Sequence, residues 1–156
     1  MLPEIIIRTA TEADLPAIHA LVRELAEYER EPEAVVTTPE IYLEDFRNGR
    51  FESQVAEHEG RIVGMTLFYW AYSTWKGRML YLEDFVVQAD YRRYGVGQRL
   101  FDAFVEEARR RDCSLVKWQV LDWNEPALAF YRRNEAIIET GWWNGKIFLK
   151  SWPAQG

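Results

Sequence analysis

The segment Arg92-Arg93-Tyr94-Gly95-Val96-Gly97 combines basic side chains with two glycines in front of a helical pattern. Glycine lets the backbone approach a ligand closely, and the first turn of a helix presents free N–H groups and the positive end of its dipole. The segment therefore predicts a phosphate or diphosphate site. It has neither the Gly-Lys-Ser/Thr of a Walker A loop nor the GxGxxG of a dinucleotide site, which argues against ATPase and dinucleotide enzymes. The alternative is a helix start whose glycines serve only a turn.

A second group that could do chemistry is the acidic pair Glu83-Asp84. These two residues are the only charged ones between Met79 and Val87, a run otherwise apolar enough for a strand buried on both faces. A carboxylate in such a place can accept a proton from a substrate or bind a cation. The alternative is a structural ion pair with one of the many arginines.

Periodicity and capping signals predict the elements that position these groups. Thr11 with Asp14 three residues later, and Thr38 before Pro39, are patterns typical of helix starts. In chain order we expect a strand at Ile5–Ile7, a helix from Thr11 to Tyr28, a shorter helix from Thr38, strands at Gln54–Glu57, Ile62–Tyr72 and Met79–Val87, a helix carrying Val96 to Ala108, a strand at Leu115–Leu121, a helix from Asn124 through Tyr131, and an Asn-Gly hairpin at Trp142–Lys146 before a last strand. This order predicts one mixed α/β domain over residues 1–156, with a predominantly antiparallel central sheet flanked by helices.

The composition narrows the class of ligand. With 19 basic and 25 acidic residues the formal net charge is −6, which argues against a nucleic-acid partner and suits a cationic small molecule. The single cysteine, Cys113, cannot form an internal disulfide, and the spacing of His19 and His58 fits no metal site, so no metal is expected. No apolar run approaches the roughly 20 residues that span a bilayer and no signal-peptide pattern is present, so we expect a cytoplasmic protein without a membrane partner.

The loop, read together with the strand before it, resembles a known family. A ligand with a long arm, such as coenzyme A, can lie along Phe85-Val86-Val87 while its diphosphate meets the helix. Arg92, Gly95 and Gly97 match the Arg/Gln-x-x-Gly-x-Gly/Ala signature of the GNAT superfamily of N-acetyltransferases. From about Ile7 to Lys150 the chain is similar to the spermidine/spermine and diamine N-acetyltransferases, including the thialysine-type enzymes. The blocks that carry this likeness are Leu25-Ala26-Glu27-Tyr28-Glu29, Leu80-Tyr81-Leu82-Glu83-Asp84-Phe85, Asp90-Tyr91-Arg92, Trp123-Asn124-Glu125-Pro126 and Phe130-Tyr131-Arg132-Arg133.

The resemblance implies a GNAT-like fold, acetyl-CoA as co-substrate and a homodimer. It implies that the coenzyme is bound by Phe85, Val86, Val87, Arg92, Arg93, Tyr94, Gly95, Val96, Gly97, Asn124, Pro126 and Tyr131. It also implies that the amine substrate is bound by Tyr28, Glu29, Glu83 and Asp84. Trp118, a large ring in a strand that borders the substrate site, is a further candidate for substrate binding.

The resemblance also implies the catalytic roles. A primary amine with a pKa near 10 is mostly protonated at pH 7, so a base must remove a proton before nitrogen attacks the thioester. Glu83 is implied as this base, acting through water, and Tyr131 as the acid that protonates the departing thiolate. Taken alone, Tyr131 is more typical of a core edge and Asn124 of a helix cap. Tyr28 and Glu29 fit a solvated helix end as well as they fit an amine channel.

The leading hypothesis is an enzyme that acetylates the primary amine of a small cationic metabolite: a polyamine, a diamine or a lysine-like amino acid. Thr140 stands where the polyamine enzymes can offer a carboxylate to the far end of their substrate, so binding of a distal ammonium is less strongly implied than acetyl transfer. The alternatives are a protein or peptide N-acetyltransferase, a non-catalytic acyl-CoA-binding regulatory domain, and a purely structural homodimer.

Overall fold

The computed structural model describes residues 3–150. The chain divides into two compact units, an N-terminal unit that ends at Trp118 and a C-terminal unit that begins at Gln119. The described part of the N-terminal unit contains, in order, β1 (Ile6–Thr9), η1 (Glu12–Asp14), α1 (Leu15–Tyr28), η2 (Pro32–Ala34), α2 (Pro39–Arg47), β2 (Glu52–His58), β3 (Arg61–Ser73), β4 (Gly77–Val87), η3 (Ala89–Tyr91), α3 (Val96–Arg110) and β5 (Leu115–Trp118). The C-terminal unit contains α4 (Glu125–Arg133).

The strands of the N-terminal unit form one five-stranded sheet in the order β1-β2-β3-β4-β5. β1 to β4 are antiparallel neighbours, and β5 joins β4 in parallel, which confirms the predicted mixed and predominantly antiparallel sheet. The β3–β4 register is interrupted once: Leu67 lies opposite Asp84, but Phe68 lies opposite Leu82. Glu83 is thus the extra residue of a β-bulge, a feature that re-aims side chains in strands.

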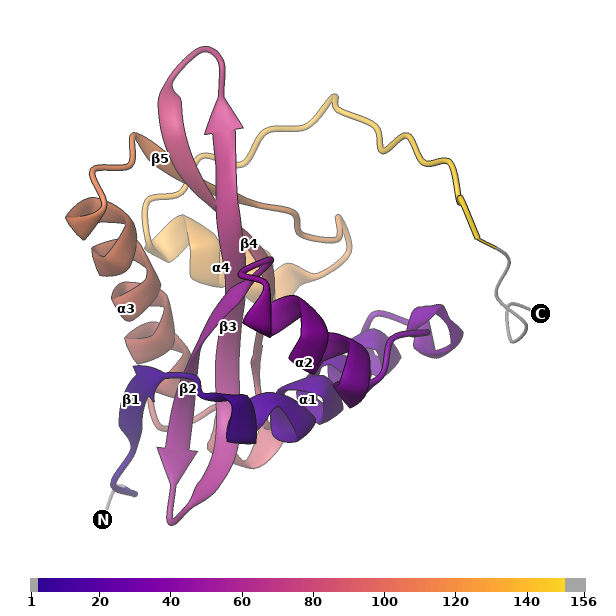
Figure 1. Ribbon diagram of the computed structural model, residues 1–156. Coiled ribbons are helices and arrows are strands. Elements are labelled where there is room, and N and C mark those ends of the chain that lie inside the picture. Colours follow the sequence, from indigo (N-terminus) through magenta and orange to yellow (C-terminus); the bar gives the residue numbers. More distant parts are fainter. Residues whose placement is uncertain (1–2, 151–156) are drawn as a thin grey trace. The chain divides into compact units, whose positions relative to one another are not determined.

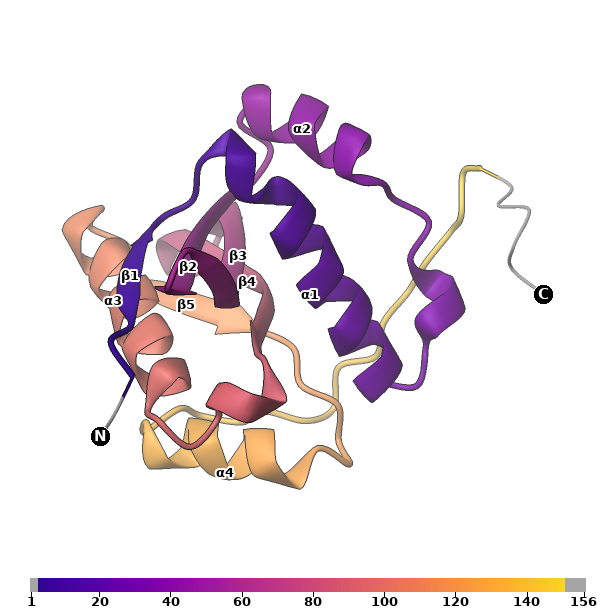
Figure 2. The same cartoon turned by 90° about the horizontal axis from the view of Figure 1, so that it is seen from below.

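Helices cover both faces of this sheet (Figures 1 and 2): α1 and α2 lie on one face and α3 lies on the other. On the first face, Leu15, Ile18 and Leu21 of α1 are buried against a group from the strands that includes Val55, Met65, Leu67 and Val86. On the second face, Val96 and Leu100 of α3 are buried with Ala56, Val63 and Val87. Burial of each such aliphatic side chain stabilises the fold by roughly 1.5–3 kcal/mol, so the sheet is held rigidly between two apolar layers.

Capping residues begin the helices where the sequence predicts. Thr38 Oγ1 accepts a hydrogen bond from the Ile41 backbone N–H at 3.2 Å, which satisfies one free donor at the start of α2. The Thr11 backbone N–H donates to Asp14 Oδ2 at 2.8 Å in a capping box at η1, directly before α1.

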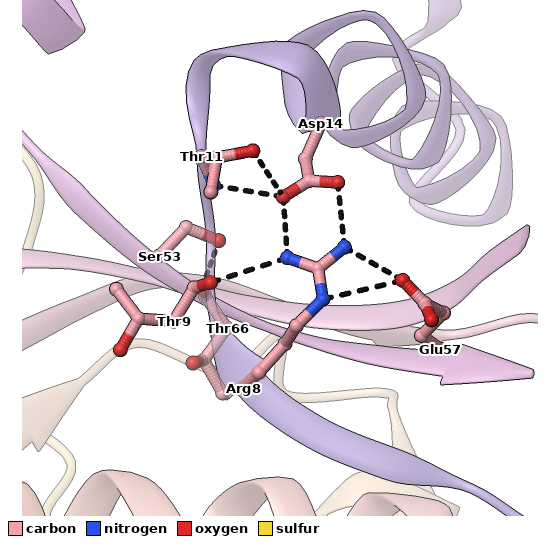
Figure 3. A network of polar contacts seen from close by, with 7 residues as sticks. All are labelled: Arg8, Thr9, Thr11, Asp14, Ser53, Glu57 and Thr66. Atoms are coloured by element: carbon pink, nitrogen blue, oxygen red, sulfur yellow. Dashed lines mark hydrogen bonds and ion pairs between the residues drawn. The ribbon is translucent and has the colours of Figure 1, made fainter. Parts of the chain in front are cut away.

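Asp14 also belongs to an ion-pair network that joins the N-terminal strand to the rest of the sheet (Figure 3). Arg8 on β1 donates to both carboxylate oxygens of Asp14, at 2.7 and 2.9 Å. Its Nη2 also donates to Glu57 Oε1 on β2 at 2.7 Å. The hydrogen bonds with Arg8 lower the pKa of the Asp14 carboxyl below its ordinary value. One guanidinium therefore fastens β1, η1 and β2 together.

The predicted C-terminal hairpin is wrong for the described residues, because no strand is present between α4 and residue 150. A type I′ Asn-Gly turn needs positive φ at both central residues, and neither Asn144 nor Gly145 has one. The Asn144 side chain instead accepts a hydrogen bond from Gln119 Nε2 at 2.6 Å. The predicted strand at Leu115–Leu121 is also shorter, since β5 ends at Trp118.

Candidate active site

The loop between β4 and α3 has the backbone of an anion-binding turn. Gly95 is the N-cap of α3 with φ of 72°, a left-handed conformation that favours glycine. A Cβ added to Gly97 would meet Phe85 Cζ at 3.7 Å and Val87 Cγ2 at 3.8 Å, which are ordinary contact distances. Packing within the protein therefore does not require glycine at position 97, and the missing side chain leaves the backbone open to close approach by a ligand. Because the free N–H groups of α3 begin here, the loop fits a phosphate group.

Arg92 ties this loop to the strand before it and to the end of α1. Its Nε donates to the Val87 carbonyl oxygen at 3.0 Å. Its guanidinium carbon lies 5.9 Å from the ring centre of Tyr28, within the range of a cation–π contact. The predicted coenzyme residue Arg92 and the predicted substrate residue Tyr28 are thus brought together.

The other predicted residues of this loop differ in exposure. Arg93 and Tyr94 are exposed, so their side chains can reach a ligand at the surface. Val96 is fully buried in the core beneath α3. A ligand can therefore contact Val96 only through its backbone.

Beyond the bulge, one edge of β4 is open. β4 pairs with β3 along its whole length as far as Val87, but β5 pairs only with Met79 to Leu82. Among residues 3–118, no strand lies on the β5 side of residues 83–87. Backbone N–H and C=O groups need partners when they are covered, and an extended arm with amides can supply them. This edge includes Phe85, Val86 and Val87, the stretch predicted to pair with the pantetheine arm.

Three carboxylates gather near the bulge, and we call Glu29, Glu83 and Asp84 the carboxylate cluster. Glu83 and Asp84 are adjacent on β4, and Glu29 is the C-cap residue of α1. Adjacent strand residues normally point to opposite faces, but the bulge breaks this alternation. Both Glu83 and Asp84 act electrostatically on Tyr42 of α2, so both lie within range of the face that α1 and α2 cover.

The carboxylate cluster has little neutralising charge around it. Among residues 3–118, neither Glu83 nor Asp84 forms an ion pair, so the alternative of a structural ion pair with arginine is not supported. Burial, followed by repulsion from Glu83 and Glu29, raises the pKa of Asp84 to about 7. Burial and the charge of Glu83 also raise the pKa of Glu29. Such a site favours a proton or a bound cation at neutral pH.

Three tyrosines border the carboxylate cluster, and none of them is among the site residues predicted from the sequence. Tyr69 on β3 donates its hydroxyl to Glu83 Oε1 at 2.8 Å, and its ring stacks on Tyr81 with ring centres 5.5 Å apart. Tyr42 of α2 is the third tyrosine, and the charges of Glu83 and Asp84 both act on it. Tyr81 lies two residues before Glu83, so strand alternation offered a signal for it. Tyr69 and Tyr42 are brought near only by strand pairing and helix packing.

Trp118, predicted to contact the substrate, lies at the end of β5. Its ring makes an edge-to-face contact with Phe101 of α3, with ring centres 5.6 Å apart. It therefore packs on the α3 face of the sheet, whereas the carboxylate cluster is in range of α2 on the other face. The predicted role of Trp118 stays a prediction.

The remaining predicted residues belong to the C-terminal unit. Asn124 Oδ1 accepts a hydrogen bond from the Ala127 backbone N–H at 3.3 Å and so caps α4, with Pro126 in the first turn. Tyr131 is 7% exposed, and its ring meets Phe130 edge-on. The capping use of Asn124 is confirmed, and the coenzyme and acid roles in this unit stay predictions.

Three other features bear on the class of site. None of the helices within residues 3–150 is long and apolar enough to cross a bilayer. Over the same range, no three His, Cys, Asp or Glu side chains converge in a way that could hold a metal ion. Cys113 is a half-buried free thiol whose pKa is raised by burial.

Comparison with known proteins adds a family and several relatives. The model of the acetyltransferase (GNAT) family matches residues 16–135. A thialysine N-epsilon-acetyltransferase of Caenorhabditis elegans is 36% identical over 142 residues, which cover 89% of this chain and 89% of that protein. The Bos taurus protein of the same name is 38% identical over 138 residues, covering 82% of this chain and 81% of that protein. A human spermidine/spermine N(1)-acetyltransferase-like protein 1 is 31% identical over 148 residues, covering 87% of this chain but 21% of that protein.

Solved structures share the fold at lower identity. An aminoglycoside acetyltransferase from an uncultured soil metagenomic sample, in complex with trehalose, aligns with a TM-score of 0.78 at 23% identity, covering 94% of this chain and 97% of that one. A transcriptional regulator from Bacillus halodurans aligns with a TM-score of 0.77 at 24% identity, covering 92% of this chain and 100% of that one. At these identities the alignments support the fold alone.

Proposed function

The chain belongs to the acetyltransferase (GNAT) family and is an acetyl-CoA-dependent N-acetyltransferase, and we propose that its substrate is the primary amine of a small cationic metabolite. The lysine analogue in the name of its thialysine-acetylating relatives puts lysine-like amino acids first. Diamines and polyamines follow, in line with the more distant spermidine/spermine relative.

The observation that carries this proposal is the carboxylate cluster beside the open edge of β4. Three carboxylates without a cationic partner among residues 3–118 form a site for a cation, and burial raises the pKa of Asp84 to about 7. A bound ammonium removes the repulsion that now favours a proton there. The open edge belongs to β4, and the glycine loop follows the same strand in the chain. The amine site and the coenzyme site therefore adjoin.

The proton chemistry follows from these neighbours. A primary ammonium with an ordinary pKa near 10 must lose a proton before its nitrogen becomes a nucleophile. We assign this proton transfer to Glu83, through a water molecule, and the binding of the cationic amine to Asp84. Tyr28 and Glu29 line the approach of the amine. Trp118, whose ring packs on the α3 face, borders the substrate only from the end of β5, next to the open edge of β4.

Acetyl-CoA, when bound, supplies the acetyl thioester. We assign its phosphates to Arg92, Arg93, Tyr94, Gly95, Val96 and Gly97, its pantetheine arm to Phe85, Val86 and Val87, and further contacts to Asn124, Pro126 and Tyr131. The Tyr131 hydroxyl then gives its proton to the departing thiolate. In this proposal both units act as one catalytic domain over residues 1–156.

The assembly belongs to the same proposal. We assign a cytoplasmic homodimer without nucleic-acid partners, in line with the net charge of −6. Large apolar side chains that are at least 75% exposed support self-association, since such surfaces mark interaction sites. Among residues 3–150 they are Trp75, Ile137, Trp142, Trp143, Ile147, Phe148 and Leu149. Sedimentation equilibrium tests this assignment: a mass of one chain at micromolar concentration contradicts it.

The activity is tested by thiol release from acetyl-CoA across a panel of lysine analogues, short diamines, polyamines and peptides, with the mass of each product measured. We expect turnover on small amines with two or more charged groups and none on peptides. Turnover on peptides alone contradicts the substrate class. Coenzyme binding without turnover on any amine contradicts the proposed function as a whole.

A further inference from the structure

Glu83 lacks the cross-strand pairing that normally orients a side chain in a strand. The bulge leaves it without a partner residue on β3, and its side chain is exposed. A glutamate with several rotatable bonds then loses conformational entropy when it is held in one place, so a fixed contact is needed. A base is effective only within hydrogen-bond reach of its proton or of one intervening water.

Tyr69 supplies such a contact from the neighbouring strand. Its hydroxyl donates to Glu83 Oε1 at 2.8 Å, a short bond of the charge-assisted kind. The ring is held in turn by Tyr81, its cross-strand partner, with an angle of 24° between the two stacked rings. Burial, and then the bond to Glu83, raise the pKa of Tyr69, so the hydroxyl keeps its proton and remains the donor.

We propose that Tyr69 is a positioning residue that holds Glu83 through Oε1 and leaves Oε2 to receive the proton of the amine. The proposal rests on the proposed role of Glu83 as base. Tyr69 contacts neither substrate nor coenzyme in this scheme. It acts by fixing the carboxylate in one position.

The groups around Glu83 determine which forces the hydrogen bond from Tyr69 must oppose. The titratable groups that face Glu83 are Glu29 from α1, Tyr42 from α2, Tyr69 from β3, and Tyr81 and Asp84 from β4. No Arg or Lys of residues 3–118 forms an ion pair with Glu83. Tyr69 is the residue in this set that donates a hydrogen bond to it.

The test is Tyr69→Phe, which keeps the ring and its stack and removes the donor. We expect kcat to fall roughly 10-fold or more, as part of the 10²–10⁴-fold that proton transfer contributes. The loss should fall on kcat, while KM for acetyl-CoA stays within about 2-fold. Tyr72→Phe is the matched control, because Tyr72 is an exposed tyrosine on the same strand, and it should leave both quantities unchanged.

A double-mutant cycle separates positioning from a structural effect. In a Glu83→Gln background, Tyr69→Phe should cause no further loss, because the group that it positions is gone. Losses that multiply, or a rise in KM for acetyl-CoA as large as the fall in kcat, overturn the proposal. If Tyr69→Phe proves unstable, Glu83→Asp draws the carboxylate away from the hydroxyl instead, and unchanged kcat then overturns it.

The outcomes also separate this inference from the proposed function. Full activity of Tyr69→Phe beside an inactive Glu83→Gln overturns the inference and leaves the function standing. A wild-type protein that binds coenzyme but acetylates no amine overturns the function itself.

Discussion

Two groups of carboxylates in the N-terminal unit have opposite surroundings. Asp14 and Glu57 share the guanidinium of Arg8, and the hydrogen bonds with Arg8 lower the pKa of Asp14 (Figure 3). Glu83 and Asp84 form no ion pair with any Arg or Lys of residues 3–118, and burial with repulsion raises the pKa of Asp84 to about 7. Both groups belong to or adjoin the same sheet, so the difference in pKa arises from the charged partners of the carboxylates.

The difference separates a structural use of carboxylates from a binding use. A carboxylate paired with arginine stabilises the folded state above pH 4 but has no free charge for a ligand. A carboxylate without a cation opposes folding when it is ionised, and a cationic substrate can relieve that cost. Loss of the arginine from the first group should therefore lower the free energy of unfolding, whereas loss of an unpaired charge from the second group should raise it.

The largest change in stability is expected for Arg8→Met, which leaves Asp14 and Glu57 unpaired. Asp14 is buried, so the free energy of unfolding at pH 7 should fall by about 2–3 kcal/mol in urea denaturation. The lowered pKa of Asp14 gives stability that is present above pH 4 and lost as pH falls through the folded-state pKa. Wild type and variant should therefore converge in acid.

Arg47→Met is the control for that variant. Arg47 pairs with Glu12 at 2.6 Å, but both side chains are largely exposed, so its loss should cost less than about 0.5 kcal/mol. Equal losses from the two variants contradict the structural role of the Arg8 network.

A smaller effect of opposite sign is expected for Asp84→Asn. The raised pKa of Asp84 means that the fold loses stability as pH rises from about 4 toward 7. Removal of the charge should raise the free energy of unfolding by roughly 1–2 kcal/mol at pH 8, and by less at pH 5. Thermal unfolding at both pH values measures it, and acetyl transfer should fall in the same variant.

Asp112→Asn is the control here, because Asp112 is exposed and pairs with Arg78 at 2.9 Å. It should change stability by less than about 0.5 kcal/mol at either pH. A gain at Asp112 as large as that at Asp84, or a loss at Asp84, contradicts the comparison.

The smallest effect is expected for Glu57→Gln. The amide oxygen can still accept from Arg8, and Asp14 keeps its two bonds, so only one charge is lost. The free energy of unfolding should fall by about 0.5–1 kcal/mol, measured in urea at pH 7. A loss as large as that of Arg8→Met would mean that Glu57, rather than Asp14, is the main partner.

Local signals were sufficient for several parts of the site. The helix starts at Thr11, Thr38 and Asn124 depend on bonds that span about three residues, and each cap is confirmed. The turn glycine Gly95 likewise has the positive φ of a position that favours glycine. These features could be predicted because their partners are neighbours in the sequence.

The C-terminal hairpin shows the limit of such signals. Asn144-Gly145 is a strong local pattern, but a hairpin also needs flanking strands that a sheet stabilises. The described residues around it pair with no strand, and neither turn residue has the required φ. The pattern predicted a turn type whose stability depends on distant partners.

The sequence by itself determined the glycine loop, the acidic pair within an apolar strand and the order of the elements around them, because each depends on residues close together in the chain. Only the tertiary structure decided which residues surround that pair. The β3–β4 register set Glu83 in a bulge opposite no residue and brought Tyr69 to its carboxylate, and the packing of α1 and α2 added Glu29 and Tyr42. These contacts are set by strand pairing and burial between distant segments, which no local pattern of residues encodes.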